Sequence, residues 1–537
     1  MPPHPNTGIP RIIHQTWRDR DIPESVGDPQ SWRRLNPTWA YMFWSDADLL
    51  DFFQTQRPDL LTLYESYPNP VQRADLARYC LLQKFGGIYA DIDTRCLRPI
   101  DVLAGDPRVV LCEEPREQAV PAIERGLDRL WFNGTMASPA GHPFWADVIS
   151  KCELMAPRRF KDVLETTGPL ILSASVDQWP DQSQLALNTC TLFSQLTAKG
   201  ELAADPEYGP FGHLRLSEHL WNGSWHVPRA EKWAKRKIGQ VRQFRHKLVS
   251  RNSLVPAREQ ARIDRDLLHS DLPATDHPAE VSIVIPLRDA AEFLPRLFEL
   301  LLNIEHPRTN LSILFGHSRS KDNTAEMLAE FKTTFAHLFQ SVRIVDPKAV
   351  TVRYRRSQRW HPKVQAKRRA GLARVRNELL GAALEEPCDW VLWMDADLVD
   401  YPADIIAQIL APREKIVVPD CVRILGGPSF DLNSFLSVYK PSRTEYFRYV
   451  CKGLLQPPES WHYRRHLHDL RYLPRVPLSG VGGTTLLVHA DVHRAGVTFP
   501  ERPYRDLIET EGFGQLARDV GVIPIGLPQI QVCHANS

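Results

Sequence analysis

The stretch FGGIYADIDTR (85–95) is a short apolar run that ends in two carboxylates, Asp91 and Asp93. A second stretch, DWVLWMDADLVDYP (389–402), repeats this arrangement with another Asp-x-Asp pair. On a β-strand, residues two apart face the same way, so each pair can share one cation. Carboxylate oxygens suit Mg²⁺ or Mn²⁺, which keep positions open for water or phosphate oxygens. The sequence therefore predicts two strands that each end in a metal site.

Apolar strand patterns alternate with helical patterns around both pairs. The expected strands are 10–14, 41–44, 88–90, 281–286, 311–315 and 390–394. The expected helices are 45 or 46 through 53, 69–85, 291–303, 324–333 and 368–384. This alternation predicts an α/β fold with a mostly parallel, Rossmann-like sheet in each half. In such sheets ligands bind beyond the carboxyl ends of the strands, where both Asp-x-Asp pairs would lie.

The chain has 537 residues, which is too long for one hydrophobic core and predicts more than one domain. We expect a first domain over 1–230, a basic helical linker over 231–278 and a second domain over 279–537. Hydrophobic residues make up 43% and charged residues 24%, as in ordinary soluble globular proteins. The net charge of +2 is too small to indicate a nucleic-acid partner.

The cysteines and the first residues bear on the compartment. Nine cysteines are scattered without a Cys-x-x-Cys pair, which favours a reducing compartment and excludes a recognisable zinc site. The start, MPPHPNTGIPRIIHQTW (1–17), lacks the basic and apolar regions of a signal peptide. No apolar run approaches the roughly 20 residues that a membrane span needs. These features predict a cytoplasmic protein.

The segment KWAKRKIGQVRQFRHKLVSR (232–251) carries eight lysines and arginines and no acid. Its apolar residues recur at nearly helical spacing, which predicts an amphipathic basic helix. Two interpretations stay open. The helix could be a peripheral contact with the anionic inner face of a membrane. It could also be a solvated helix that packs its apolar stripe on one of the domains.

Around the first pair, QRADLARYCLLQKFGGIYADIDT (72–94) resembles the core signature of the DXD sugar-binding glycosyltransferases. That family includes the fungal initiating α-1,6-mannosyltransferases. Further segments are similar to the family in the same order: IPRIIHQTW (9–17), YMFWSD (41–46), FNGTMASPAGHPFW (132–145) and HLWNGSW (219–225). The resemblance covers residues 8–228 and implies a GT-A fold.

This first resemblance also implies roles for single residues. It implies that Asp91 and Asp93 carry the metal and the nucleotide-sugar. The other residues that it places around the donor are Asp75 and Arg78 at the sugar and diphosphate, His14, Gln15 and Trp17 near the nucleotide, and His219 near the metal or diphosphate. Two plainer interpretations stay open. Asp75 and Arg78 could be a surface pair three residues apart on a helix, and Trp17 could belong to the core.

The second pair has different surroundings. The segments that carry the second resemblance are VSIVIPLRDAAEFLPRLFELL (281–301), SRSKDNTAEML (318–328), RRAGLARVRNELL (368–380), VGGTTLLVHADVHRAGVTFP (481–500) and ETEGFGQLARDVGVIPIGLP (509–528). Together they resemble the fungal mannan-polymerase family of GDP-mannose-dependent α-mannosyltransferases, over residues 280–536. The chain departs from that family at Arg319, where an Asp usually follows the residue matching Ser318.

The second resemblance implies that Asp395 and Asp397 form the metal and diphosphate site, with His534 as a further metal ligand. The other implied residues are Pro286, Leu287 and Arg288 under the base and ribose, Arg369, Arg376 and Asn377 on the helix before the metal strand, and Glu509 and Glu511 as candidates for the acceptor-side carboxylate. The choice between the two glutamates stays open.

Both resemblances imply retaining enzymes. We therefore expect a bifunctional, metal-dependent glycosyltransferase with Mn²⁺ or Mg²⁺ in each site. The second half is expected to transfer mannose from GDP-mannose, and the first half a hexose, onto a glycan or glycolipid acceptor. One alternative is that only one half is catalytic and the other is a sugar-binding or structural module. Another is a haloacid-dehalogenase-like phosphohydrolase, because ADIDT (90–94) matches that signature with Asp91 as nucleophile.

Overall fold

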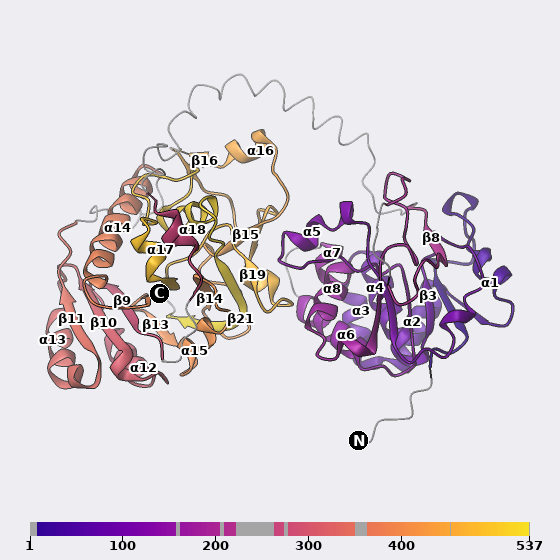
Figure 1. Cartoon of the computed structure of the whole chain (residues 1–537), viewed down its shortest axis with the longest axis horizontal. Helices are drawn as coiled ribbons and strands as arrows, with labels where there is room; N and C mark the ends of the chain where they lie inside the picture. Colours follow the sequence, from indigo (N-terminus) through magenta and orange to yellow (C-terminus); the bar gives the residue numbers. More distant parts are fainter. Residues whose placement is uncertain are drawn as a thin grey trace. The chain divides into compact units, whose positions relative to one another are not determined.

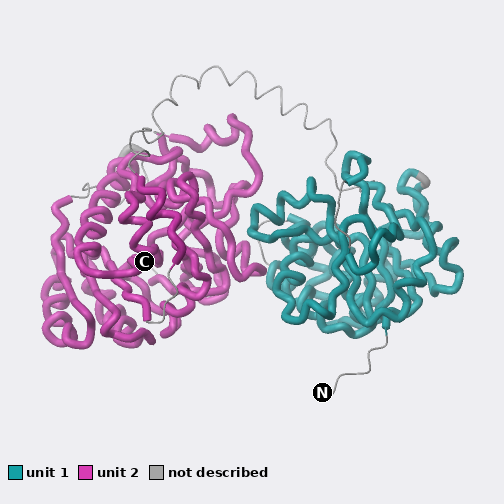
Figure 2. Tube along the Cα trace, in the orientation of Figure 1, with its two compact units in different colours: residues 1–229 teal, residues 230–537 magenta. Residues whose placement is uncertain are grey.

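The structure is a computed structural model that describes residues 8–156, 162–203, 209–221, 263–272, 278–349, 362–451 and 453–535. The chain forms two compact units, residues 1–229 and 230–537, here called unit 1 and unit 2 (Figure 2). Each unit is mixed α/β and has its own sheet (Figure 1).

Unit 1 is built on a sheet that, over its described residues, has six strands in the order β2-β1-β3-β6-β5-β7. The strands are β1 (Ile12–Thr16), β2 (Ala40–Trp44), β3 (Gly87–Ala90), β5 (Val109–Cys112), β6 (Thr135–Ser138) and β7 (Leu185–Asn188). Strands β1, β2 and β3 are parallel, as are β5 and β7, whereas β6 runs antiparallel to both β3 and β5. A separate short pair joins β4 (Thr94–Cys96) to β8 (Ser217–His219).

Helix α4 (Pro70–Phe85) leads directly into the first Asp-x-Asp strand. Asn69 caps its start, since its side chain accepts a hydrogen bond from the Val71 amide, and Pro70 occupies the first turn, where no amide donor is needed. Gly86 and Gly87, with φ angles of 65° and 91°, end the helix. A side chain at Gly87 would place its Cβ 2.4 Å from the Ile12 carbonyl oxygen, so only glycine lets β3 lie this close to β1.

The remaining helices of unit 1 cover the sheet (Figure 1). They are α1 (Gln30–Leu35), α2 (Asp46–Gln56), α3 (Leu61–Ser66), α5 (Val120–Ile123), α6 (Phe144–Met155), α7 (Val163–Thr166) and α8 (Pro169–Gln178). Ser45 caps α2 with a capping box to Asp48. The aromatic side chains of Trp32, Phe53 and Trp145 are fully buried in the core.

Unit 2 has a larger sheet, with nine strands over its described residues in the order β11-β10-β9-β12-β20-β14-β21-β13, and β19 pairs with β21. The strands are β9 (Val281–Leu287), β10 (Leu311–His317), β11 (Ser341–Val345), β12 (Trp390–Met394), β13 (Leu398–Asp400), β14 (Ile416–Val422), β19 (Val476–Pro477), β20 (Thr485–His489) and β21 (Ile525–His534). The short pairs are β15 (Phe435–Ser437) with β18 (Arg464–His466) and β16 (Val450–Cys451) with β17 (Leu454–Leu455). The helices are α11 (Arg265–His269), α12 (Leu294–Leu302), α13 (Thr324–Phe335), α14 (Pro362–Ala383), α15 (Ile405–Leu410), α16 (Arg443–Arg448), α17 (Ala490–Arg494) and α18 (Glu509–Asp519).

The two units share one strand topology. The path β10-β9-β12-β20-β14-β21 in unit 2 repeats the path β2-β1-β3-β6-β5-β7 in unit 1. In both paths the first three strands are parallel, the fourth is antiparallel to its two neighbours, and the last two are parallel. The prediction of a mostly parallel sheet in each half is therefore confirmed, and the antiparallel strands β6 and β20 are additions that the sequence patterns do not predict.

The predicted linker is described only in part. The basic segment 232–251 lies outside the described residues. Within 263–272, α11 packs on unit 2: the Asp264 amide donates to the Ala495 carbonyl at 2.9 Å, and Lys415 Nζ donates to the Leu268 carbonyl at 2.6 Å. Among the described residues, no helix has the length and apolar character needed to cross a membrane.

Candidate metal and donor sites

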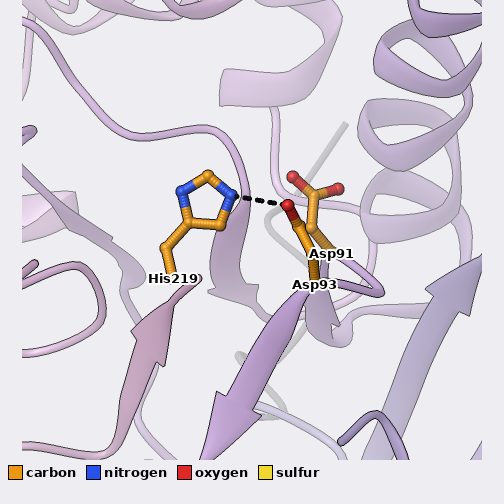
Figure 3. A group of neighbouring side chains, drawn as sticks. All are labelled: Asp91, Asp93 and His219. Atoms are coloured by element: carbon orange, nitrogen blue, oxygen red, sulfur yellow. Dashed lines mark ion pairs between the residues drawn. The ribbon is translucent and has the colours of Figure 1, made fainter. Parts of the chain in front are cut away.

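Three side chains from distant parts of unit 1 meet at the carboxyl end of β3. One ligand atom each of Asp91, Asp93 and His219 lies within 4.8 Å of the others. His219 arrives because β8 pairs with β4, which places it opposite Thr94, the residue after Asp93. Figure 3 shows the imidazole pointing toward the carboxylates, with His219 Nε2 3.3 Å from Asp93 Oδ2. Two carboxylates and one imidazole are a donor set that fits a divalent cation such as Mn²⁺.

Arg78 holds Asp91 in place from the preceding helix. Its Nη2 lies 3.1 Å from Asp91 Oδ1, and its Nη1 donates to Asp91 Oδ2 at 3.3 Å. The same guanidinium lies 3.2 Å from Asp75 Oδ1, and both of these side chains are about 95% buried, with 5% and 4% exposed. The interpretation of Asp75 and Arg78 as a surface pair is therefore wrong. The Tyr89 hydroxyl adds a hydrogen bond of 2.8 Å to Asp91 Oδ1.

The charges of the unit 1 site influence one another. Burial raises the pKa of Asp91, and the nearby Arg78 guanidinium offsets part of that rise. Burial also acts to raise the pKa of Asp93, but the hydrogen bond and charge of His219 hold it below its ordinary value. For His219, burial acts to lower the pKa, and the bond to Asp93 raises it overall. A proton on His219 Nε2 would thus compete with a cation bound by His219 and the two carboxylates.

The buried carboxyl of Asp75 makes the free energy of unfolding of unit 1 depend on pH. Burial raises its pKa from 3.8 to about 6, although Arg78 opposes the rise. A raised carboxyl pKa means that the folded state holds the proton more tightly than the unfolded state. The Asp75 contribution to the free energy of unfolding therefore falls as the pH rises between these two pKa values, by roughly 3 kcal/mol. We expect Asp75→Asn to flatten this part of the pH profile, as measured by urea unfolding at several pH values. An unchanged profile in Asp75→Asn, with exposed Asp101→Asn as control, would contradict the assignment.

Glu114 is a buried carboxyl beside this site that the sequence interpretation missed. It follows β5, and burial raises its pKa to about 7, with the Asp91 charge adding to the rise and His219 opposing it. The signal was present in the sequence: VVLCEE (109–114) is another apolar run that ends in two acids. Because the pair lacks the Asp-x-Asp spacing, it is not predicted as part of a metal site.

Of the three residues predicted to lie near the nucleotide of unit 1, two are fully buried and one is half-buried. His14 is fully buried, with Nε2 donating to the Gly86 carbonyl at 2.9 Å and Nδ1 accepting from Trp44 at 3.1 Å. Burial lowers its pKa to about 4. Both ring nitrogens of His14 are thus hydrogen-bonded within the protein, and its position near the nucleotide stays a prediction. Gln15 is also fully buried and donates to the Asp91 carbonyl at 3.3 Å, so it supports the metal loop. Trp17 is half-buried at the end of β1.

The second site repeats the first in unit 2. One ligand atom each of Asp395, Asp397 and His534 lies within 4.8 Å of the others. His534 Nε2 is 3.0 Å from Asp397 Oδ2, and the pairing of β21 with β13 sets His534 opposite Leu398, the residue after Asp397. The Phe430 ring packs on the imidazole at 4.0 Å. Burial raises the pKa of Asp395 to about 6.

Only one of the three predicted residues on α14 faces the second Asp-x-Asp pair. Arg376 Nη2 lies 3.9 Å from Asp395 Oδ1, and its guanidinium sits over the Trp393 ring at 5.4 Å. Asn377 instead exchanges two hydrogen bonds of 2.9 and 3.0 Å with the Phe499 backbone, which makes it a structural clamp. Arg369 pairs with Glu509 at 3.1 Å.

Glu509 and Glu511 lie in the first turn of α18, and both are buried. Each has an arginine partner: Arg369 for Glu509, and Arg464, 2.8 Å away, for Glu511. The helix N-terminus adds favourable charge for both. Their pairing with arginine is compatible with either one facing an acceptor, so the predicted choice between them stays open.

The residues predicted under the base and ribose lie at the carboxyl end of β9, the parallel neighbour of β12: Pro286 and Leu287 are the last two residues of the strand, and Arg288 follows it. Register pairs Val284 with Trp393, so the two strands end at the same edge of the sheet. Leu287 is a core residue and Pro286 is half-buried, while Arg288 carries the charge at the strand end and lies 3.5 Å from Asp289.

The two sites share more than their ligands. In each, the amide of the first aspartate donates to the neighbouring antiparallel segment: Asp91 to the Gly134 carbonyl at 2.7 Å, and Asp395 to the Thr484 carbonyl at 2.9 Å. In each, a glycine of that segment leaves room for the charged groups. A Cβ on Gly134 would lie 2.7 Å from Asp91 Oδ2, and a Cβ on Gly483 would lie 2.4 Å from Arg376 Nη2. In both units the space around the first aspartate is therefore compatible with a cation held by two aspartates and a histidine.

Gly134→Ala tests the cradle in unit 1. The added methyl group would meet both Asp91 and the Phe132 ring, so we expect Asp91 to shift. We expect a displacement of this kind to lower turnover in unit 1 by about tenfold to a hundredfold, which a nucleotide-sugar hydrolysis assay measures when unit 2 carries Asp395→Asn. Gly381→Ala, where a Cβ meets no atom within 4 Å, is the matched control. Full activity in Gly134→Ala would show that the position of Asp91 is unimportant.

The comparisons with known proteins agree with this division of the chain. Residues 24–110 match the model described as the glycosyltransferase sugar-binding region containing DXD motif, and residues 261–503 match the Anp1 model. The chain is 36% identical over 178 residues to inositol phosphoceramide mannosyltransferase 3 of Schizosaccharomyces pombe, which covers 32% of this chain and 46% of that protein. It is 30% identical over 274 residues to the mannan polymerase complex subunit mnn9 of the same organism, which covers 48% of this chain and 80% of that subunit.

Among solved structures, one to which the chain is similar is the mannosyltransferase PcManGT from Pyrobaculum calidifontis, in complex with GDP-Man and Mn²⁺. It is 13% identical and covers 52% of this chain and 64% of that one, with a TM-score of 0.29.

The mostly parallel sheets, the Asp-x-Asp pairs at their strand exits and the two family models define the class of the protein: it is a glycosyltransferase. Because the relationship to mnn9 extends over four fifths of that subunit, the chain belongs to the Anp1 family. Both resemblances that the sequence predicts are thereby confirmed.

Proposed function

We propose that the chain is a bifunctional, metal-dependent, retaining mannosyltransferase with one active site in each unit. The observation that carries the proposal is the repeated set of two aspartates, a histidine and an arginine at equivalent strand exits. A unit that served only as a structural or sugar-binding module would not need this complete set. The alternative, that only one unit is active, is tested by replacing the first aspartate of each pair separately.

The chemistry follows from the charges at each strand exit. In the transfer, the bond from the anomeric carbon to the diphosphate oxygen breaks, and a bond to the acceptor hydroxyl oxygen forms. The nucleoside diphosphate leaves, and the hydroxyl proton passes to the diphosphate or to solvent. A divalent cation bound by the aspartates and the histidine would supply charge neutralisation for the diphosphate. Arg78 and Arg376 orient the first aspartate of each pair, and a dedicated general base is not required in a retaining transfer.

The names of the relatives support the choice of substrates. The relatives of unit 2 are named as mannan polymerase subunits, and those of unit 1 as inositol phosphoceramide mannosyltransferases. We infer GDP-mannose as donor in unit 2 and a mannose donor in unit 1. The proposed acceptors are a glycan and a glycolipid. We also propose that the chain assembles with further subunits. We also propose a cytoplasmic location, with a peripheral membrane contact through 232–251.

The phosphohydrolase alternative has little support in the geometry. A nucleophilic aspartate needs an oxygen free to attack phosphorus. Both oxygens of Asp91 are engaged by Arg78, and Oδ1 also accepts from Tyr89. This arrangement suits a fixed metal ligand better than a nucleophile.

Metal removal tests the proposal on the full chain. We expect hydrolysis of GDP-mannose in a screen of nucleotide-sugars, loss of that hydrolysis with EDTA, and recovery when Mn²⁺ is added back. Release of free nucleoside diphosphate is the measured quantity. Hydrolysis that persists in EDTA, or a preference for sugar phosphates without a nucleotide, would contradict the proposed function.

A further inference from the structure

Unit 1 contains a cavity of about 580 Å³ that none of the site residues described above line. It opens where β5 and β7 end, at the same edge of the sheet as Asp91, and its size is typical of small-molecule sites. The buried lining includes Glu113, Trp131 and Ser173, and the exposed rim includes Asp128, Arg129 and Asp177.

Two segments of chain connect this cavity to the metal site. In the first, Glu113 lines the cavity, while the next residue, Glu114, acts electrostatically on Asp91 and His219. Successive residues of an extended chain point to opposite sides, so a single layer of backbone separates the two spaces. In the second, Trp131 lines the cavity, and the chain then runs to Gly134, whose carbonyl binds the Asp91 amide.

Both segments are firmly held, so the wall between the spaces is preformed. The Glu113 amide donates to the Asn188 carbonyl at 3.0 Å, and the Glu114 amide donates to the Leu130 carbonyl at 2.7 Å. Ser173 Oγ accepts from the Trp131 amide at 2.8 Å. A ligand in the cavity would therefore find a fixed position relative to the donor site.

The charges of the lining narrow the class of ligand. Three carboxylates, those of Glu113, Asp128 and Asp177, face one guanidinium, that of Arg129, which is ion-paired with Glu113. An excess of negative charge disfavours a phosphate or another anion. Carboxylates accept hydrogen bonds from several hydroxyl groups at once, and each such charge-assisted bond is stronger than a neutral one. The lining thus suits a neutral ring that carries many hydroxyl groups.

We propose that this cavity binds a polyhydroxylated ring of the acceptor beside the donor site of unit 1 and so anchors the acceptor, whose reacting hydroxyl group belongs to a part outside the cavity. The inference rests on the proposed transferase function but concerns a binding site that can be measured without turnover. The ring could come from a hexose at the end of a glycan or from a cyclitol in a glycolipid headgroup. The experiment separates these two sources.

The test measures binding of methyl α-D-mannopyranoside and of myo-inositol to the full chain by saturation-transfer NMR, without donor or metal. We expect at least one ring to bind. Glu113→Gln is expected to weaken that ring by about tenfold, because it removes charge-assisted hydrogen bonds. Leu187→Trp, which fills the cavity from its half-buried wall, is expected to abolish binding. Glu117→Gln, an exposed carboxylate on the same connection outside the cavity, should bind as the wild type does.

Each outcome of this test decides something. Binding of the mannoside alone assigns the site to a glycan, and binding of inositol alone assigns it to a glycolipid headgroup. If neither ring binds, or if Leu187→Trp binds as well as the wild type while thermal unfolding shows an intact fold, the proposal is overturned. Ring binding without any nucleotide-sugar hydrolysis would instead sink the transferase function of unit 1 and leave the cavity site standing.

Discussion

We expect Asp395→Asn to lower the proposed mannosyl transfer by unit 2 roughly a thousandfold and to leave the proposed transfer by unit 1 in place, and we expect Asp91→Asn to do the reverse. The reason is that each aspartate is the first carboxylate of its own Asp-x-Asp, histidine and arginine set. Asparagine keeps the size of the side chain but removes the charge that a cation needs. Product analysis with one acceptor for each unit, on the full chain, measures the two activities separately.

Exposed carboxylates supply matched controls for these two variants. Asp400→Asn lies on β13, just beyond the unit 2 site, and Asp101→Asn lies on the surface of unit 1. Both controls should keep full activity. If Asp91→Asn changes no product at all, unit 1 is not catalytic and the two-site model fails. If the double variant Asp91→Asn/Asp395→Asn stays active, neither metal site carries the reaction.

We expect Arg78→Met to lower the free energy of unfolding of unit 1 by roughly 3–5 kcal/mol and to abolish the activity proposed for this unit. Methionine fills much of the space but leaves Asp75 without a buried cationic partner, and Asp75 has 4% of its side chain exposed. Asp91 loses both of its contacts with Arg78 at once. Urea unfolding of the full chain, followed by tryptophan fluorescence, measures the change, with activity assayed in parallel.

A second substitution separates charge from packing in this experiment. Arg78→Met/Asp75→Asn removes the unpaired buried charge, so it should recover part of the lost stability without recovering activity. Arg376→Met in unit 2 is the matched comparison. Its nearest Asp395 oxygen lies 3.9 Å away, and Asp395 is 34% exposed, so we expect a smaller cost in stability. Equal unfolding of wild type and Arg78→Met would contradict the central role of this arginine.

The elements next to the two aspartate pairs were predictable because their signals are local. Asn69 and Pro70 start a helix, and Gly86 and Gly87 stop it, through bonds and angles within a few residues. The apolar run 390–394 is observed as β12 with the same bounds. A strand that is buried on both faces appears in the sequence as a continuous apolar run, so it can be recognised without knowing which strands pair with it.

Other features depend on contacts between distant residues and could not be predicted in this way. Strand β6 runs antiparallel between β3 and β5, and nothing in TMAS (135–138) states its direction. Glu114 likewise lies beside the candidate metal site only because β5 ends at the same edge of the sheet as β3, which its own segment does not indicate. His14 was predicted near the nucleotide because it belongs to a motif, and that motif did not indicate that the fold buries it against Trp44.

The sequence by itself determined that two apolar strands end in Asp-x-Asp and that each half resembles a glycosyltransferase family. Those are properties of short segments. The two resemblances implied His219 and His534 at these sites, but only the tertiary structure shows how they reach them: each is set in place by a strand pairing with the residue after the second aspartate. The tertiary structure also decided that Asp75 and Arg78 are buried together and that a cavity lies beyond Glu114. Hydrogen bonding across a sheet joins residues far apart in the chain, and their side-chain pattern alone does not specify which partners meet.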